Sequence, residues 1–366
     1  MTVNERKTVL VAPMNWGLGH ATRMVPVVEV LIKQGVKVIL AADKRPYDFL
    51  RQRFPECEMI RLPGFEPVYP EKRSMTVQML FSFPKMMRCA REANRKLQKI
   101  IEKYQIDVVI SDNRYELYSP KIYSIFITHQ LNIRTRKTQK PFKPIITYLI
   151  NRYISKYDEL WIPDFEDLQQ NLAGSLSHPA RYPVKNYHFI GPLSRFKHQT
   201  VGKTAFFDLL VILSGPEPQR TVFEQIIMEQ LARTNLQTVI LQGKPEEKKK
   251  QTQGNISLIS HTDDEEMAAL IRSAPLILSR PGYSTIMDLT VFGKKAIFVP
   301  TPGQTEQEYL AQKLERSGYC YYEEQKSFDL VRAVKEAEKY TGLPETPGDN
   351  HLEIIVSNLL HKIQVT

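Results

Sequence analysis

Short, almost continuously apolar runs alternate with helical segments along nearly the whole chain. In the first half such runs occupy residues 8–14, 36–41, 107–111, 124–128, 159–162 and 187–190. Residues 21–34, between the first two runs, have amphipathic helical spacing and end before Gly35. Strands that are apolar on both faces are typical of parallel sheets covered by helices on both sides. The alternation therefore predicts an α/β protein with doubly wound parallel sheets.

The pattern restarts after a polar stretch and divides the chain into two similar halves. A chain of 366 residues is long for a single hydrophobic core. New apolar runs occupy residues 207–213, 238–241, 256–260, 276–279 and 296–300. We expect an N-terminal domain at 1–190, a linker at 191–206 and a second domain at 207–345. Residues 346–366 are expected to form a C-terminal helix that packs back on the first domain.

The charge of the chain predicts an anionic partner. The sequence has 50 Lys and Arg against 40 Asp and Glu, a net charge of +10, and residues 117–157 contain no acidic residue. The preceding segment 75–87 is apolar and rich in methionine, and cationic residues follow it as far as Lys99. Such a segment suits an anionic membrane surface, and it also suits a core-packed helix with a solvated basic face. We expect peripheral membrane binding and, without a recognisable nucleic-acid module, no nucleic acid.

Hydropathy and cysteine usage indicate a cytoplasmic protein. No apolar run approaches the roughly 18 residues of a membrane-spanning helix. The run at 9–13 is too short for the core of a signal peptide. The three cysteines, Cys57, Cys89 and Cys320, lack the spacing of metal ligands and fit free thiols in a reducing compartment. We expect neither a disulfide nor a metal site.

The strongest functional signal lies between Ser279 and Glu308, where two strand, turn and helix units follow each other. Gly282 lets the backbone approach a ligand closely, and Ser284 and Thr285 can cap the first helix. The free amide groups at that helix start favour a negative charge, such as a diphosphate. Asp288, about one turn further, can accept hydrogen bonds from two vicinal hydroxyls. Diphosphate beside ribose describes a nucleotide.

A glycine loop directly after the first strand carries a histidine. Gly17 and Gly19 alone are a weak signal, because the third glycine of the dinucleotide pattern Gly-x-Gly-x-x-Gly is absent. His20 stands at the carboxyl edge of the first strand and has a pKa that suits a general base. A helix-capping or buried structural histidine is the alternative. Asp112, at the end of a later strand, is a candidate partner for His20, although such aspartates also cap turns.

These motifs together resemble, in order along most of the chain, those of the GT-B glycosyltransferases of family 28. Residues 17–20 are similar to the family's Gly-Gly-His loop, 129–132 to its His-Glu-Gln-Asn motif and 191–195 to its interdomain Gly-Asn-Pro-Val-Arg motif. Residues 264–267 parallel the loop near the nucleobase, and 279–308 parallel the donor site. The resemblance implies a GT-B fold, with two Rossmann-like domains that face each other across a cleft.

The resemblance also implies a set of site residues. His20 would be the catalytic base, assisted by Asp112. The acceptor would meet the first domain at Gly17, Gly19, His20, Arg23, His129 and Asn132. The donor would meet the linker and second domain at Arg195, Ser214, Gly215, Arg220, Ser279, Arg280, Gly282, Ser284, Thr285, Asp288, Gln304 and Gln307.

The sequence departs from the family pattern at several of these places. Asp288 is one methylene shorter than the family's glutamate, and the loop at 213–220 has a single glycine where the family has several. Gln130 replaces an acid of the first-domain motif, which predicts a different acceptor. Glu308 replaces a second glutamine and completes a capping box with Thr305, so we interpret it as a helix cap.

The activity implied by the resemblance is an inverting sugar transfer without a metal ion. An N-acetylhexosamine or a hexose would move from a UDP-sugar to a lipid-linked or other cell-envelope acceptor, at the inner face of the plasma membrane. Helix amides and Arg195 would stabilise the leaving diphosphate in place of a cation. Two alternatives stay open. The Gly-x-Gly-His-x-x-Arg pattern also resembles nucleotide-sugar hydrolases of nonulosonate synthesis, and the reduced loop at 213–220 would also fit a non-catalytic nucleotide-sugar-binding protein.

Overall fold

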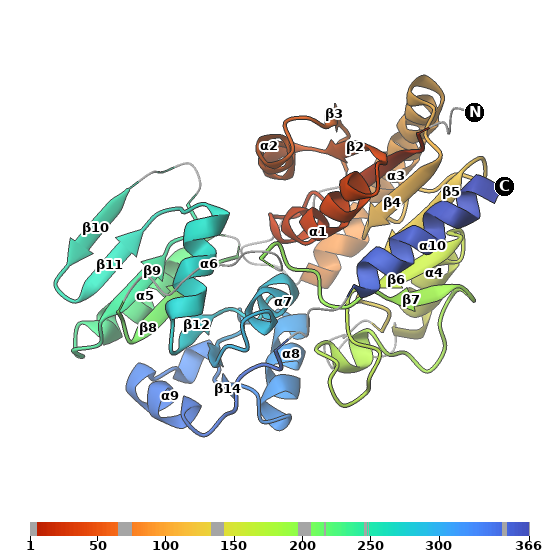
Figure 1. The fold of residues 1–366 in the computed structure, drawn as a ribbon. Coiled ribbons are helices and arrows are strands. Elements are labelled where there is room, and N and C mark those ends of the chain that lie inside the picture. The colour runs from red at the N-terminus through yellow and green to blue at the C-terminus, as the bar shows by residue number, and fades with distance from the viewer. Residues whose placement is uncertain are drawn as a thin grey trace.

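The computed structural model describes residues 6–64, 75–132, 143–196, 206–215, 217–244, 247, 249–345 and 350–365, with the backbone alone at 75–84 and 364–365. Two parallel α/β units make up this part of the chain (Figure 1). Four of the eight cations in the acid-free stretch 117–157 (Arg134, Arg136, Lys137 and Lys140) and most of the linker fall in 133–142 and 197–205, outside the described residues. The predicted doubly wound fold is confirmed.

The first unit is a seven-stranded parallel sheet in the order β3-β2-β1-β4-β5-β6-β7. Buried aliphatic residues fill its strands, as in β1 and β4, where every residue is buried. Its elements are β1 (Thr8–Pro13), α1 (Gly19–Lys33), β2 (Lys37–Ala42), α2 (Lys44–Arg53), β3 (Glu58–Arg61), α3 (Met75–Tyr104), β4 (Val108–Asp112), β5 (Tyr123–Ile127), α4 (Lys143–Ile154), β6 (Glu159–Ile162) and β7 (Tyr187–Phe189).

Alternate residues of the first sheet face opposite layers of helices. Val9 and Val11 pack with α1 in one cluster, whereas Leu10 packs with Leu97 of α3 in another. The strand register sets Pro13 of β1 beside Asp112 of β4, so the loops that follow these two strands start side by side. This edge, where the strands end, carries the residues of the candidate site.

The second unit is a seven-stranded sheet in the order β10-β11-β9-β8-β12-β13-β14, parallel except for the edge pair β10 and β11. Its elements are β8 (Leu209–Ile212), α5 (Gln219–Leu231), β9 (Thr238–Leu241), β10 (Lys250–Gln253), β11 (Ile256–Ile259), α6 (Asp264–Ser273), β12 (Ile277–Ser279), α7 (Tyr283–Thr290), β13 (Ala296–Phe298), α8 (Thr305–Arg316), β14 (Tyr321–Tyr322) and α9 (Leu330–Ala337). In Figure 1, α7 and α8 lie on the side of this unit that is turned toward the first sheet.

The last helix, α10 (His351–Val365), lies on the first unit, along α1 (Figure 1). Gln34 at the end of α1 donates a hydrogen bond to the backbone carbonyl of Glu353 at 2.9 Å, and Lys362 forms an ion pair with Glu159 of β6 at 3.1 Å. The apolar face of α10 is buried, through Leu352, Ile355, Val356, Leu359 and Ile363.

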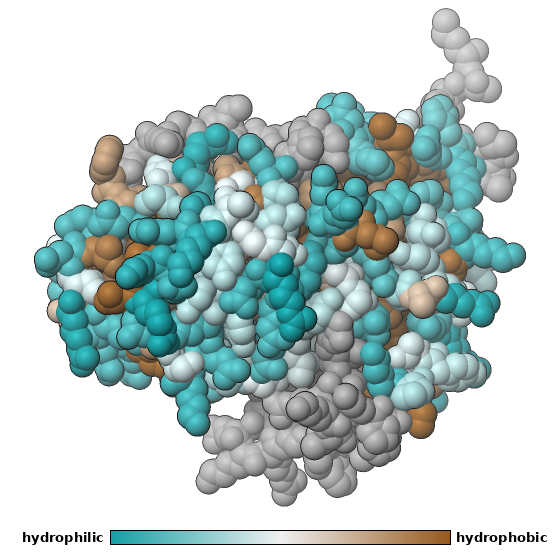
Figure 2. Space-filling view, turned by 90° about the horizontal axis from the view of Figure 1, so that it is seen from below, coloured by the Kyte–Doolittle hydropathy of each residue, from teal (hydrophilic) through white to brown (hydrophobic). Residues whose placement is uncertain are grey.

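Seen from below, the described surface is mainly hydrophilic, and its hydrophobic side chains lie in small separate groups (Figure 2). Among the described residues, none of the helices is both long and apolar enough to cross a membrane.

Candidate active site

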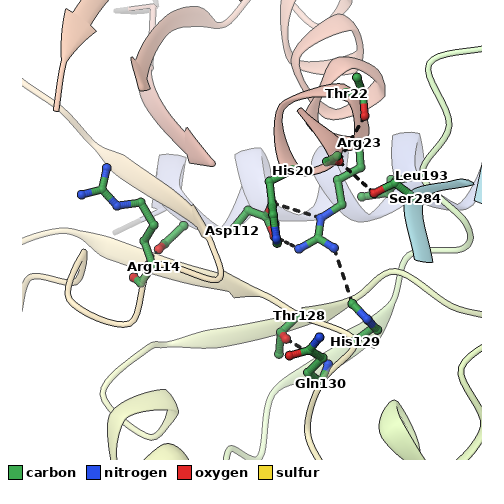
Figure 3. Close-up of polar contacts among 12 residues, drawn as sticks. His20, Thr22, Arg23, Asp112, Arg114, Thr128, His129, Gln130, Leu193 and Ser284 are labelled. Atoms are coloured by element: carbon green, nitrogen blue, oxygen red, sulfur yellow. Dashed lines mark hydrogen bonds and ion pairs between the residues drawn. The ribbon is translucent and has the colours of Figure 1, made fainter. Parts of the chain in front are cut away.

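His20 and Asp112 form a hydrogen-bonded pair where β1 and β4 end. His20 is the second residue of α1, and its Nδ1 lies 2.9 Å from Oδ2 of Asp112 (Figure 3). The Asp112 side chain is fully buried, whereas that of His20 is 19% exposed. An ionised carboxylate only accepts hydrogen bonds, so Nδ1 carries the proton and Nε2 is left as a lone-pair base. The structure thus brings together the two residues predicted as base and partner.

Arg23 holds the opposite side of the same carboxylate. It lies one helical turn after His20, its Nε donates to Asp112 Oδ2 at 3.0 Å, and its Nη2 donates to Oδ1 (Figure 3). The guanidinium is buried, with 2% of the side chain exposed. The resemblance assigned Arg23 to the acceptor, but its two-pronged contact is with Asp112. A buried carboxylate with two cationic or donor neighbours is fixed in one orientation.

The electrostatics of this cluster keep His20 neutral and Asp112 charged. Burial lowers the pKa of His20 below its ordinary value, the charge of Arg23 adds to the effect, and Asp112 opposes it. Burial alone would raise the pKa of Asp112, but Arg23 and then His20 outweigh it, so this pKa lies below its ordinary value. A neutral imidazole beside a charged carboxylate is the form that can accept a proton.

His129, which follows β5, connects this cluster to the second unit. Its Nδ1 lies 3.5 Å from Arg23 Nη1, and its Nε2 lies 2.9 Å from Oε1 of Glu306 in the first turn of α8. Its ring stacks on that of Tyr283 of α7, with centroids 3.9 Å apart and planes 14° apart. The neighbouring Gln130 donates a hydrogen bond to the other oxygen of Glu306. Residues from both units therefore meet at His129.

The start of α7 touches the start of α1. Ser284 donates a hydrogen bond to the backbone carbonyl of Gly19 at 2.9 Å. A Cβ on Gly19 would lie 3.0 Å from the Ser284 hydroxyl, so the close approach requires a glycine. We expected Ser284 and Thr285 to cap α7; that is wrong, since the helix starts at Tyr283 with Gly282 as its N-cap. Both hydroxyls instead lie within the first turn.

Two adjacent linker residues, Ser194 and Arg195, form polar contacts with the second unit. Ser194 donates a hydrogen bond to Oδ1 of Asp288 in α7 at 2.6 Å. Arg195 forms an ion pair of 3.0 Å with Asp264 at the start of α6. Burial raises the pKa of Asp288 to about 6, an effect that Arg195 and Ser194 oppose. Asp288 therefore lies beside the linker, one turn into α7. Among the described residues, no hydrogen bond to its other oxygen, Oδ2, is seen, so that oxygen can accept from hydroxyls.

Other predicted donor residues are bound within the second unit. Arg280, which is 1% exposed, donates to the carbonyls of Val299 and Pro300 at 2.9 Å and lies over the ring of Phe223. Arg220 donates to Gln242 O at 3.1 Å and pairs with two glutamates of its own helix region. These contacts give both guanidinium groups structural partners.

The remaining predicted residues lie at the end of β12, at the start of α8 and in loops. Ser279 is fully buried at the end of β12, Gln304 is the N-cap of α8, and the Gln307 side chain accepts from the Thr301 amide at 2.8 Å. Glu308 accepts from the amide of Gly303, just before α8, at 3.0 Å. The capping box expected from Thr305 and Glu308 is wrong, since Gln304 is the N-cap and Thr305 is already the first residue of the helix. Four more lie in loops: Gly17 (φ 70°), Ser214 with its neighbour Gly215 (φ 105°), and Asn132, whose backbone amide donates to Leu176 O.

Sequence reasoning missed Glu306, Tyr283 and Ser194. Each forms a contact between parts of the chain that are far apart in sequence, at separations of 177, 120 and 94 residues. Glu306 stands inside the motif at 303–308, next to the predicted Gln307, and an acid beside an amide at a helix start was its one visible signal.

Comparison with known proteins identifies both units. The profile of the glycosyltransferase family 28 C-terminal domain matches residues 210–350, and that of glycosyl transferase family 1 matches residues 9–142. An uncharacterized glycosyltransferase of Methanosarcina acetivorans is 25% identical over 323 residues, which cover 83% of this chain and 80% of that protein.

Two further likenesses concern a curated relative and a solved structure. The UDP-N-acetylglucosamine--N-acetylmuramyl-(pentapeptide) pyrophosphoryl-undecaprenol N-acetylglucosamine transferase of Listeria welshimeri is 23% identical, over 81% of this chain and 84% of its own. Arabidopsis thaliana UGT89C1, complexed with UDP-L-rhamnose, superposes with a TM-score of 0.62 at 13% identity, over 98% of this chain and 95% of its own, and so shares the fold. This chain is a GT-B glycosyltransferase whose second domain is of the family 28 type.

Proposed function

We propose that this enzyme transfers a sugar from a UDP-sugar to a hydroxyl acceptor with inversion at the anomeric carbon. The observation that carries the proposal is the His20–Asp112 pair, 2.9 Å apart at the start of α1 and next to the start of α7. The Listeria relative is named for a UDP-sugar substrate, and UGT89C1 was crystallised with one, which supports the UDP class. An N-acetylhexosamine or a hexose is the proposed sugar.

In the proposed reaction, Nε2 of His20 removes the proton of the acceptor hydroxyl. The acceptor oxygen then forms its bond to the anomeric carbon while the bond from that carbon to the diphosphate oxygen breaks, and UDP leaves with the electron pair. Attack from the face opposite the diphosphate inverts the configuration. The imidazolium that forms on His20 is stabilised by the charged Asp112 through the Nδ1 hydrogen bond.

The donor would lie on α7 and α8. Free amide groups in the first turn of α7 suit the diphosphate, and Oδ2 of Asp288, the oxygen that Ser194 does not contact, suits the ribose hydroxyls. Gln304 and Gln307 at the start of α8 lie near the place of the sugar. Helix amides and Arg195 would stabilise the charge that develops on the leaving group, so we propose that transfer needs no divalent ion.

The acceptor is proposed to be lipid-linked or another cell-envelope glycan, reached at an anionic membrane surface. On α4, Ile145 is 60% exposed, Tyr148 62% and Leu149 38%. Tyr153 of α4 contacts Met87 of α3 at 3.5 Å, so the two helices lie together. The exposed cations of α3 and at or just after the end of α4 are Lys85, Arg88, Arg91, Arg95, Lys96, Lys99, Arg152 and Lys156. Apolar side chains within a basic surface suit anionic lipid headgroups.

The enzyme activity is tested by incubating the full chain with UDP-sugars, with and without short lipid-diphosphate sugars as acceptors. A thermal shift with one UDP-sugar, followed by a product with inverted anomeric configuration by NMR, supports the proposal. Full-rate release of free sugar without an acceptor would instead identify a hydrolase. Donor binding with neither product would identify a non-catalytic binding protein.

The membrane proposal is tested by co-sedimentation with vesicles of phosphatidylglycerol and of phosphatidylcholine. Binding is expected to the anionic vesicles only and to weaken at high salt. Changing Ile145 and Leu149 to Ser should weaken it. Val331→Ser is the matched control, because Val331 is 64% exposed on α9 of the other domain. Equal loss in both variants would contradict the assignment of the surface.

A further inference from the structure

We propose that Arg23 is a positioning residue of the active site: it orients Asp112, sets the proton positions of His20 and His129, and connects the catalytic pair to the second domain. The inference deepens the proposed function and rests on it. It concerns a residue that contacts no substrate in our assignment and acts through its neighbours.

The contacts of Arg23 leave it no surface for a substrate. Its side chain is 2% exposed, and Nε and Nη2 are both engaged by the two oxygens of Asp112. The planar fork of a guanidinium matches a carboxylate in this way, and a lysine cannot reproduce it, because its ammonium is a single point charge. Arg23 therefore fixes the plane of the Asp112 carboxylate and with it the direction in which that group faces His20.

The same arginine determines the tautomers of two histidines. Asp112 accepts from His20 Nδ1, so the proton of His20 lies on Nδ1. Arg23 has donors only, so His129 Nδ1, which it faces at 3.5 Å, must be the acceptor. The remaining nitrogen of His129, Nε2, then donates to Glu306 at 2.9 Å. The hydrogen bonds among these side chains are therefore satisfied when His20 carries a proton on Nδ1 and His129 carries its proton on Nε2 alone.

The series of hydrogen bonds that runs from His20 through Asp112, Arg23 and His129 ends in the second domain. Glu306 lies at the start of α8, and the ring of Tyr283, on α7, stacks against His129. Burial would raise the pKa of Glu306, but the hydrogen bond from His129 holds it below its ordinary value. The catalytic pair in the first domain is thus connected, through Arg23 and His129, to the helices that carry the proposed donor residues.

Loss of Arg23 has a defined chemical consequence. Asp112 would remain fully buried with His20 as its one strong partner, and a buried carboxylate without a cation readily takes up a proton. A protonated Asp112 no longer requires a donor on His20 Nδ1. The His20 proton can then move to Nε2, the nitrogen that must accept the proton of the acceptor hydroxyl. The base would be present but in the wrong form.

The kinetic test compares Arg23→Lys with Arg23→Gln in the full chain. Both variants are expected to lower kcat by about 10- to 100-fold, part of the roughly 10²–10⁴-fold supplied by a general base, with the donor KM unchanged. The titratable and charged groups that face His20 are Asp112 of β4, Arg23 of α1, His129 after β5 and Glu306 of α8. Removing the Arg23 charge should move the acidic limb of the pH profile to higher pH in Arg23→Gln but not in Arg23→Lys. Loss of active protein alone would move neither limb.

A second measurement needs no substrate and separates this inference from the proposed function. In long-range ¹⁵N–¹H spectra of histidine-labelled wild-type protein, His20 is expected as the Nδ1–H tautomer and His129 as the Nε2–H tautomer. Both should become mixtures in whichever Arg23 variant folds. If the wild type shows both expected tautomers but has no transferase activity, the proposed function is wrong and the positioning role of Arg23 still holds. An Nε2–H tautomer at His20 in the wild type, or unchanged tautomers in a folded variant, would overturn the role of Arg23.

Discussion

The hydroxyl of Ser284 donates to the backbone carbonyl of Gly19 at 2.9 Å and joins α7, where the proposed donor site begins, to α1, which carries the proposed base His20. Residues 265 positions apart in the chain thereby set the spacing between the two halves of the proposed active site. A methyl group on Gly19 would lie 3.0 Å from this hydroxyl. The spacing is therefore sensitive to a single carbon atom.

Gly19→Ala should separate the two helix starts and lower kcat several-fold. The added Cβ would meet the Ser284 hydroxyl at 3.0 Å but its Cβ at an ordinary 3.5 Å. Adding Ser284→Ala should therefore restore much of the activity, although the hydrogen bond is lost at a cost of about 1 kcal/mol. Steady-state kinetics of the four proteins in a double-mutant cycle provide the measurement. Additive losses would show that the two residues are independent.

Loss of the base should affect the chemical step and leave donor binding intact. His20→Ala is expected to lower kcat by about 10²–10⁴-fold, and Asp112→Asn should approach it because the wrong tautomer of His20 becomes accessible. His351→Ala, an exposed histidine at the start of α10, is the control and should behave as the wild type. A thermal shift with the donor should be retained in all three variants.

The pH dependence of kcat follows from the lowered pKa of His20. Burial and Arg23 place that pKa below the ordinary 6.5, so the base stays neutral and active at pH 6.5 and loses activity only as the pH falls further. The profile should be measured at saturating donor, which removes the contribution of Asp288 to binding. An acidic limb above pH 6.5 would contradict the burial of the base.

Asp288 should make donor binding weaker in acid. Burial raises its pKa to about 6, so at pH 5 about one tenth of the molecules keep the charged form that accepts from the ribose hydroxyls, and UDP affinity should fall about tenfold from its value at pH 7. Calorimetric titration of UDP at several pH values measures this. Asp288→Asn should bind UDP more weakly at pH 7 and show no such pH dependence.

The raised pKa of Asp288 should affect stability in the opposite direction to donor binding, which strengthens as the pH rises. The folded pKa of Asp288 lies above its unfolded value, so the folded state binds more protons between these values, and stability falls as the pH rises from about 4 to about 6. Asp288→Asn should be more stable than the wild type at pH 7, on the order of 1 to 2 kcal/mol, and gain little at pH 4. Urea unfolding at the two pH values provides the comparison. An equal gain at both would show that ionisation is not the cause.

The sequence predicts contacts within one domain better than contacts between the two domains. The apolar runs predict parallel strands, and the rule that functional loops follow the carboxyl ends of such strands brings His20 together with Asp112. Contacts between the domains, such as His129 with Glu306, depend on how two separately patterned units dock, and periodicity contains no information on that. Arg280 shows the converse case: it stands inside the donor motif, yet two backbone carbonyls of its own domain bind its guanidinium.

The apolar face of α10 should contribute to the stability of the first domain, because this helix, although it follows the second domain in the sequence, packs on the first. Leu359 is 2% exposed in that contact, so Leu359→Ala is expected to lower the free energy of unfolding by about 2–4 kcal/mol. Ile354→Ala on the same helix is the matched control, since Ile354 is 57% exposed and its loss should cost no more than about 0.5 kcal/mol. Alanine has a higher helix propensity than leucine or isoleucine, so neither change weakens the helix itself. A larger loss of unfolding free energy in Leu359→Ala therefore reports lost packing. Equal effects in urea unfolding would mean that α10 is not docked on α1 in solution.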